Sequence, residues 1–218
     1  MRGLLRLRRA SSVGRAAGTA RAARRAAGGD ALGPGRRLRV GAVNHGDHDQ
    51  VILSEVVADA RLATWEFDDA RAWLERARQR PMEPLAAEVW VLDPALEYVL
   101  LVSHRVRGWV PPGGKVEPGE GPRAAAAREL LEETGLDVGL LPGPAAVAVR
   151  SFRNDWSPTL ALSYVAVVER DVPLGGEPEQ PAAWFRLDDG WNSVFQADQG
   201  RIQAHARYLE AARASSAR

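Results

Sequence analysis

Three glutamates have a spacing that points directly to chemistry. Glu129, Glu132 and Glu133 stand at positions i, i+3 and i+4 of a stretch that favours a helix, so they share one helical face. Neighbouring carboxylates repel one another at neutral pH unless a cation lies among them. Oxygen ligands without histidine or cysteine suit Mg²⁺ or Mn²⁺, and Mg²⁺ is usually held by few carboxylates together with substrate phosphates. Such a triplet alone is typical of a solvated helix face, but it also fits phosphate chemistry assisted by a divalent cation.

The loop before the glutamates favours the chemical interpretation. Its sequence, WVPPGGKVEPGEGP, contains Gly113 and Gly114, which allow the backbone to approach other groups closely. The run also exposes carbonyl and N–H groups that can meet a metal ion or a phosphate. A glycine loop followed by an acidic helix therefore predicts a site in which backbone and carboxylates act together.

A helix and several strands must hold these residues in place. The stretch RAAAARELLEET predicts a helix with Pro122 near its first position and Gly135 just beyond its end. Before the loop, AAEVWVLDP and EYVLLVSH predict a hairpin. After the helix, strands are predicted in PAAVAVRSF, TLALSYVAVVER and PAAWFRL, and a final helix over residues 199–212. The residues of that helix expected to face inward are Ile202, Ala206, Leu209 and Tyr208.

Charge is divided unevenly along the chain. The 218 residues carry a formal net charge of +1, but residues 1–40 hold eleven arginines and one acid, a net of +10. The remaining 178 residues hold 18 basic and 27 acidic groups, a net of −9. The chain contains no run of about 18 apolar residues, so the sequence predicts no helix that spans a membrane. The absence of cysteine excludes disulfides, cysteine zinc sites and a thiol nucleophile.

Three segments are predicted from these patterns. Residues 1–40 are expected to be a disordered basic leader, with a dispensable leader, a polyanion-binding arm and an organelle transit peptide all left open. Residues 41–82 are expected to be a helical extension, because FDDARAWLERARQR has apolar residues at helical spacing and VILSEVVADARLA suggests an earlier helix. Residues 83–214 are expected to form the main domain.

The stretch from Gly114 to Leu136 resembles the Nudix box, with no departure at any defined position. The matching residues are Gly114, Glu120, Arg128, Glu129, Leu130, Glu132, Glu133, Gly135 and Leu136. The resemblance implies a Nudix fold of the α/β (α+β) class, in which a mixed β-sheet core is sandwiched between helices. It also implies that residues 83–214 are a hydrolase domain acting on a nucleoside diphosphate linked to another moiety.

The resemblance implies a metal site on the acidic helix. Glu132 and Glu133 would be the main ligands of Mg²⁺, or of Mn²⁺, while Glu129 would share metal or base duty. The carbonyl of Gly113 would be a further ligand. A water activated by the cation would attack phosphorus in line, and the cation would neutralise charge on the leaving oxygen.

Other residues of the box, and a later loop, receive supporting roles from the same resemblance. Arg128 and Glu120 would orient the carboxylates and brace the loop. Family members place an extra catalytic acid in a loop well after the box. In this chain the candidates are Glu177 and Glu179 in GGEPEQPAAW, and either is also interpretable as an ordinary turn residue.

The candidates for substrate binding carry weaker signals. Trp109 and Trp156 are rings that could stack on a base, with a place in the core or on the surface as the alternative. The basic candidates for pairing with phosphates are Lys115, Arg105, Arg150 and Arg153.

The function predicted from the sequence is a Mg²⁺-dependent diphosphatase acting on a nucleoside di- or triphosphate or a related nucleoside diphosphate derivative. The alternatives are a pathway-specific diphosphatase of secondary metabolism and a non-catalytic module that senses a nucleotide. A prenyl diphosphate isomerase normally needs a catalytic cysteine, which this chain lacks. We expect a small-molecule partner rather than nucleic acid or a membrane, and a cytoplasmic location. The helices before the hairpin are candidates for a homodimer contact.

Overall fold

The computed structural model describes residues 45–78, 85–151 and 158–217. In these parts of the chain, four helices surround one seven-stranded sheet. The elements are α1 (His45–Leu62), α2 (Phe67–Ala77), β1 (Ala86–Leu92), β2 (Tyr98–His104), β3 (Gly108–Val110), β4 (Gly113–Lys115), α3 (Pro122–Thr134), β5 (Ala146–Ser151), β6 (Pro158–Val167), β7 (Ala182–Arg186) and α4 (Ala197–Ser216). The predicted leader at residues 1–40 lies outside the described residues.

The sheet is mixed, with strand order β3-β2-β1-β6-β5. β1 and β6 run parallel, while β1–β2, β2–β3, β2–β7, β1–β4 and β5–β6 are antiparallel. β1 and β6 lie in the middle and are buried along almost their whole length. Strands covered on both faces are largely apolar, and AAEVWVL and TLALSYVAV follow this pattern except for Glu88, Thr159 and Ser163, which are also buried.

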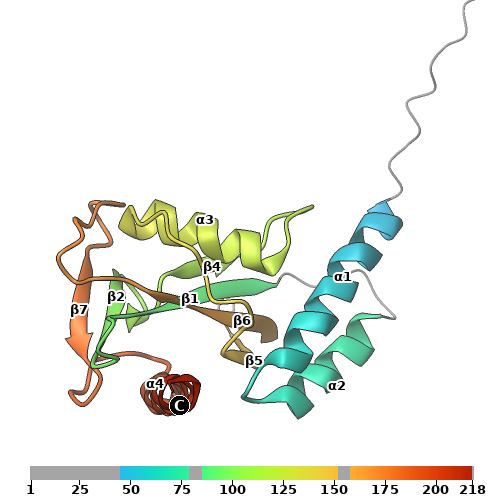
Figure 1. Cartoon of the computed structure of the whole chain (residues 1–218). Helices are drawn as coiled ribbons and strands as arrows, with labels where there is room; N and C mark the ends of the chain where they lie inside the picture. The colour runs from blue at the N-terminus through green and yellow to red at the C-terminus, as the bar shows by residue number, and fades with distance from the viewer. Residues whose placement is uncertain (1–44, 79–84, 152–157, 218) are drawn as a thin grey trace, which may run out of the picture. The chain divides into compact units, whose positions relative to one another are not determined.

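Helices cover both faces of the sheet, as Figure 1 shows with α3 above it and α4 below it. Alternate side chains of β1 divide between the two sides, because successive residues of a strand point to opposite faces. Val89 and Val91 pack in one core cluster with Leu130 of α3. Trp90 packs in a second cluster with Ile202 of α4. The predicted mixed sheet between helices is therefore confirmed.

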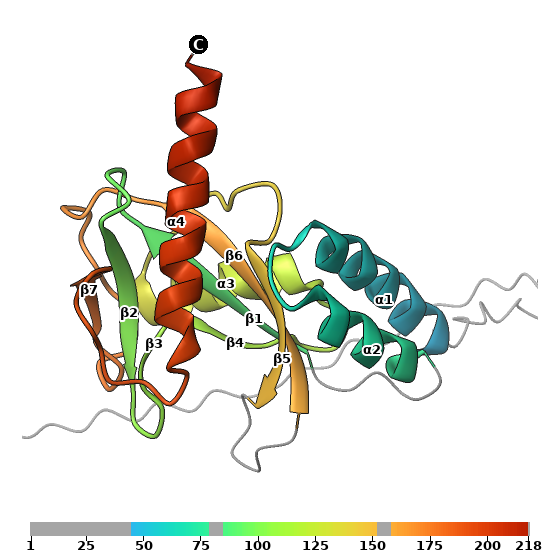
Figure 2. The same ribbon diagram turned by 90° about the horizontal axis from the view of Figure 1, so that it is seen from below.

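α2 lies against β5, at one end of the sheet, and α1 packs beside α2 (Figure 2). Both helices contribute side chains to the same core cluster. Trp73 and Leu74 of α2 belong to the same buried cluster as Leu130 of α3. The segment between α1 and α2 is tied to the start of β5, since the backbone of Thr64 donates to the carbonyl of Ala145 at 3.1 Å. The extension is thus helical as predicted, and the boundary near residue 82 stays a prediction.

Three local features differ from the sequence-based expectations. The loop before α3 contains a short strand, β4, whose three residues are too few to be recognised as a strand in the sequence. α4 runs over residues 197–216 rather than 199–212. Tyr208, expected to face inward, is 58% exposed because the second half of α4 extends past the sheet (Figure 2). None of the helices in the described segments is long and apolar enough to cross a membrane.

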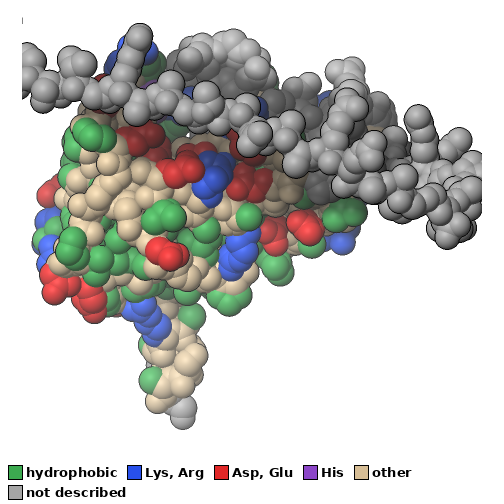
Figure 3. Space-filling model, turned by 90° about the horizontal axis from the view of Figure 1, so that it is seen from above, with side chains coloured by type: hydrophobic (Ala, Val, Ile, Leu, Met, Phe, Trp, Pro, Cys, Tyr) green, Lys and Arg blue, Asp and Glu red, His purple; other side chains and the backbone are tan. Residues whose placement is uncertain are grey.

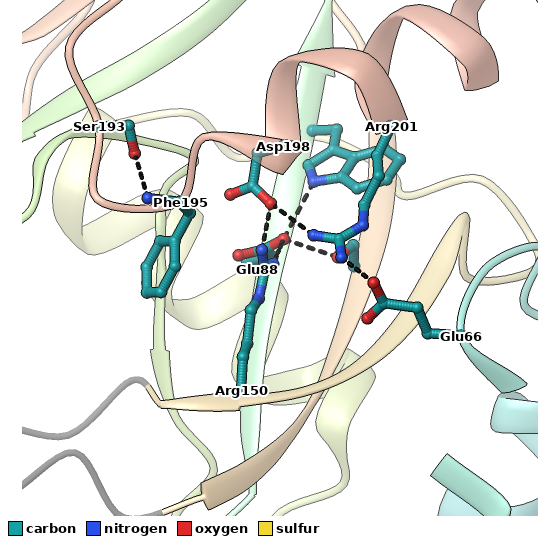
Figure 4. A network of polar contacts seen from close by, with 9 residues as sticks. Glu66, Glu88, Arg150, Ser193, Phe195, Asp198 and Arg201 are labelled. Carbon is teal, nitrogen blue, oxygen red and sulfur yellow. Dashed lines mark hydrogen bonds and ion pairs between the residues drawn. The ribbon is translucent and has the colours of Figure 1, made fainter. Parts of the chain in front are cut away.

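A buried ionic network joins α4 to the sheet, beneath β1 (Figure 4). Arg150 of β5 donates to Glu88 of β1 at 2.9 Å and is also paired with Asp198 of α4. Arg201 continues the network from Asp198, at 3.1 Å, to Glu66 before α2. Arg150, a predicted phosphate-pairing residue, is therefore engaged by two carboxylates within the protein.

Replacing Arg150 by methionine is expected to lower the free energy of unfolding by about 3–5 kcal/mol, because Glu88 and Asp198 would remain buried without their shared cation. Arg71→Met is the matched control, since Arg71 pairs with Asp68 on the exposed face of α2. The control should change stability by no more than about 0.5 kcal/mol. Urea unfolding followed by circular dichroism measures both values, and equal losses in the two variants would contradict this role for Arg150.

Candidate active site on helix α3

The helix that carries the three glutamates is bounded by residues suited to its two ends. Pro122 occupies the first turn, where a missing N–H costs nothing. Gly135 ends the helix in the left-handed conformation, with φ of 73°, which glycine adopts readily. The predicted bounds of the helix are confirmed, so the i, i+3, i+4 face is real.

The three carboxylates on this face differ in burial. Glu132 is exposed, Glu129 is half-buried, and Glu133 is only 8% exposed. Leu130, on the adjoining face, is fully buried against the sheet. The acidic face therefore runs from solvent at Glu132 into the protein at Glu133.

Arg128 connects four parts of the Nudix box. Its guanidinium makes two parallel hydrogen bonds to Glu120, both at 3.0 Å, and donates to the Lys115 carbonyl at 3.1 Å. It also donates to Glu129 at 2.8 Å and Glu132 at 3.1 Å. Hydrogen bonds from Arg128 hold the pKa of Glu120 below its ordinary value. On the face viewed in Figure 3, where α3 lies, acidic side chains surround a basic one. Arg128 and Glu120 are placed where the predicted orienting role requires them.

Glu133 is a carboxyl group whose charge the protein does not fully compensate. The backbone N–H of Gly113 donates to its Oε2 at 2.8 Å. Burial nevertheless raises the pKa of Glu133 to about 7, helped by the nearby charges of Glu129 and Glu177, while the Gly113 N–H and the charge of Arg107 oppose the rise. Burial also raises the pKa of Glu129. Burial thus raises the pKa values of two neighbouring carboxyl groups of the acidic face, and added positive charge would lower them.

The glycines of the loop let the backbone approach these groups. A Cβ on Gly114 would lie within 2.6 Å of the Glu129 carboxyl group. A Cβ on Gly113 would lie within 2.6 Å of Glu88 on the neighbouring strand β1. Side chains are excluded at both positions because β4 is packed between β1 and α3.

These residues fit a hard divalent cation. The carboxyl groups of Glu129 and Glu133 offer oxygen ligands and carry raised pKa values, and added positive charge would relieve both. In the described segments, no three His, Asp or Glu side chains are yet gathered closely enough to hold a metal ion. Arg128 holds Glu129 and Glu132, and Gly113 holds Glu133. These side chains would have to turn toward a common point when a cation binds.

The loop after β6 brings one of the two later acids to this site. The backbone of Gly175 donates to the Thr134 carbonyl at 2.8 Å, which ties the loop to the end of α3. Glu177 follows and is close enough to raise the pKa of Glu133. Its carboxylate accepts a hydrogen bond from Gln180 at 2.7 Å. Glu179 is exposed in the same loop, and no comparable interaction with α3 is found for it among the described residues.

The predicted substrate-binding residues are distributed more widely. Trp109 packs against Phe185, with ring centroids 4.8 Å apart, and is half-buried on the α4 side of the sheet. Lys115 is exposed beside Gly114, and Arg105 is exposed in the turn between β2 and β3. Trp156 and Arg153 lie outside the described residues.

Arg107 is a residue near the acidic face that the sequence did not single out. It lies in the same turn as Arg105, and its charge acts on Glu133. The motif HRVRG contains two arginines, and nothing local distinguishes the exposed one from the half-buried one. The electrostatic interaction between Arg107 and Glu133 depends on the fold of the turn rather than on its local sequence.

Comparison with known proteins agrees with this geometry. The NUDIX domain matches residues 82–208, more than half of the chain, so the chain belongs to the Nudix family. The prediction of a Nudix hydrolase is confirmed at the level of the family.

Several relatives are similar in sequence over part of their length. A bis(5'-nucleosyl)-tetraphosphatase [asymmetrical] of Sus scrofa is 40% identical over 104 residues, 44% of this chain and 67% of the relative. Diphosphoinositol polyphosphate phosphohydrolase 2 of Rattus norvegicus is 33% identical over 122 residues, 52% of this chain and 61% of the relative. The m7GpppN-mRNA hydrolase dcap-2 of Caenorhabditis elegans is 36% identical over 105 residues, 45% of this chain but 13% of the relative. For the last two, the chain spans less than two thirds of the relative's length.

Solved structures give more distant matches. A NUDIX family hydrolase from Clostridium perfringens is 19% identical, with a TM-score of 0.49, covering 57% of this chain and 97% of the other. A C. elegans Ap4A hydrolase is 23% identical, with a TM-score of 0.48, covering 61% and 99%. The family assignment rests on the domain match rather than on these.

Proposed function

We propose that this chain hydrolyses a phosphoanhydride bond in a nucleoside di- or triphosphate or a related nucleoside diphosphate derivative, with Mg²⁺ or Mn²⁺ as cofactor. The observation that carries the proposal is the buried carboxyl group of Glu133. It accepts a hydrogen bond from the Gly113 N–H, and burial and the charge of nearby Glu129 raise its pKa to about 7. A cation would stabilise the ionised carboxylates of such a site, and substrate phosphates would complete the coordination of that cation.

Each residue of the site has a proposed task. Glu129, Glu132 and Glu133 would hold the cation together with the Gly113 carbonyl, and Arg128, braced by Glu120, fixes the directions of Glu129 and Glu132. When bound, the cation would lower the pKa of the attacking water and neutralise charge on the phosphates.

Glu177 is the proposed acceptor of the proton released as water attacks phosphorus. Its carboxylate lies in solvent at the edge of the site and acts electrostatically on Glu133, whereas Glu179 does not among the interactions described. An exposed carboxylate can take up a proton and pass it to bulk water. The remainder of the acceleration comes from positioning and electrostatics, as is usual for phosphoryl transfer.

The substrate class follows from what the relatives share. By their names they act on a bis-nucleosyl tetraphosphate, a diphosphoinositol polyphosphate or an mRNA cap. Phosphoanhydride chemistry is common to these, while the attached group differs. Because two of these three names contain a nucleoside, we propose a small nucleotide as the substrate. A cytoplasmic location and a homodimer stay predictions.

A screen of phosphoanhydrides with Mg²⁺ and Mn²⁺ tests this proposal. Nucleoside triphosphates, dinucleoside polyphosphates and nucleotide sugars should be compared, with chromatography and phosphate assays to identify the products. We expect at least one nucleotide to be hydrolysed, and excess chelator to stop turnover. Turnover of a non-nucleotide diphosphate alone would favour the secondary-metabolism alternative. Nucleotide binding without turnover would favour the sensing module.

A further inference from the structure

The turn between β2 and β3 is held in place by backbone hydrogen bonds. The Nδ1 atom of His104 accepts hydrogen bonds from the backbone N–H groups of Val106 at 3.1 Å and Arg107 at 3.2 Å. Burial and the charges of Arg107 and Arg105 lower the pKa of His104, which keeps that nitrogen available as an acceptor. On the other side, the Arg107 carbonyl accepts from the backbone of Val194 at 2.9 Å. The backbone of Arg107 is therefore fixed on both sides.

The side chain of Arg107 contrasts with the other half-buried arginines of the described segments. Four of these have hydrogen-bonding partners inside the protein: Arg123 with the carbonyls of Leu140 and Leu141, Arg128 with Glu120, Glu129 and Glu132, Arg150 with Glu88 and Asp198, and Arg201 with Glu66 and Asp198. Among the described residues, no hydrogen bond or ion pair is found for the Arg107 guanidinium. A guanidinium taken partly out of water without a partner is costly unless an anion joins it.

The position of the turn indicates where that anion would lie. The backbone N–H of Ser103, at the end of β2, donates to the Pro181 carbonyl at 3.0 Å, and the loop before Pro181 is tied to the end of α3 by the hydrogen bond from Gly175 to Thr134 at 2.8 Å. Burial lowers the pKa of Arg107, and the charge of Glu133 partly offsets this effect. Arg107 is thus close enough to Glu133 for their charges to interact, but it is not paired with it. An anion placed between the two would have the positive charge of Arg107 on one side. A cation on Glu129 and Glu133 would add positive charge on the other side.

We propose that Arg107 binds a phosphate of the substrate from the side opposite the metal-binding carboxylates. This inference rests on the proposed function above. The planar guanidinium presents paired N–H donors that match two phosphate oxygens, and its fixed backbone limits the conformational entropy lost on binding. Arg105, two residues earlier, is exposed in the same turn, and its pairing with a phosphate stays a separate prediction.

Binding of methylenediphosphonate in the presence of Mg²⁺ tests the role of Arg107 on the full chain. This probe presents two linked phosphonates and is not hydrolysed. Calorimetric titration should show that Arg107→Gln weakens its binding at least tenfold, while Arg107→Lys, which keeps the charge without the planar fork, loses less. Arg76→Gln, on the exposed face of α2, is the control and should stay within about twofold of the wild type.

A second titration, with Mg²⁺ alone, separates substrate binding from a structural role. Arg107→Gln keeps the backbone hydrogen bonds of the turn and removes a positive charge near Glu133, so Mg²⁺ should bind as tightly as in the wild type or more tightly. Weaker Mg²⁺ binding would indicate damage to the site and overturn the inference. Unchanged probe binding in Arg107→Gln, with nucleotide hydrolysis intact in the wild type, would overturn it while leaving the proposed function standing. A wild type that neither binds the probe nor hydrolyses any nucleotide would overturn both.

Discussion

Replacing Glu133 by glutamine should nearly abolish turnover and also stabilise the metal-free protein at pH 8. The amide can still accept the Gly113 N–H but cannot carry the charge that holds a cation, so kcat should fall by roughly 100- to 1,000-fold. The gain in stability has a separate cause. The pKa of Glu133 is raised from 4.5 to about 7 in the folded protein, mainly by burial.

The sign of the stability effect depends on pH. A carboxyl group with a higher pKa in the folded state favours folding at low pH, and this contribution is lost as the pH rises from 4.5 to about 7. At pH 8 the wild-type carboxylate therefore costs up to about 3 kcal/mol, which glutamine avoids. Urea unfolding in excess chelator should show the variant more stable at pH 8, with little difference at pH 4.

Glu117→Gln is the control, because Glu117 is exposed in the loop before α3 and is not one of the defined positions of the box. It should leave both kcat and the pH dependence of stability near wild type. A Glu133→Gln variant that keeps full activity would contradict its role as a metal ligand. A stability difference independent of pH would contradict the raised pKa.

Replacing Gly114 by alanine should reduce kcat by about 100-fold. The added methyl group would overlap the Glu129 carboxyl, which must then leave its place beside Arg128. Because Arg128 also holds Glu120 and Glu132, the displacement would disturb the orientation of the whole acidic face. Steady-state kinetics with increasing Mg²⁺ should show that a higher metal concentration is needed for half-maximal rate.

Gly190→Ala provides the matched control for this substitution. Gly190 follows β7, and a Cβ there would meet no atom within 4 Å. The control should keep wild-type kinetics and metal dependence. Equal losses of activity in the two variants, or normal metal dependence in Gly114→Ala, would show that the close approach of β4 to Glu129 is not important for the site.

The local parts of the site could be predicted from the sequence because their signals are local. The spacing of Glu129, Glu132 and Glu133, with Pro122 before them and Gly135 after them, defines a helix and its acidic face without tertiary information. The strands of the hairpin were predictable for the same reason, since the β1 and β2 segments are continuous runs of β-forming residues.

The parts that depend on long-range packing could not be predicted. The pattern does not reveal that Glu133 is buried while Glu132 is exposed, because this depends on where β4 crosses the helix. The pairing of Arg150 with Glu88 joins positions 62 residues apart, and sequence reasoning assigned this arginine to phosphates instead. Arg107 was missed because its neighbour Arg105 has the same chemistry and only the fold of the turn separates them.

The most direct test of the central claim is to follow the oxygen of the attacking water. Hydrolysis of the preferred nucleotide should be carried out in ¹⁸O-labelled water with Mg²⁺, and the products should be examined by mass spectrometry. Attack on phosphorus by one water predicts a single ¹⁸O atom, found in one of the two phosphate-containing products after a single turnover. Turnover with no label in either phosphate product would contradict the account.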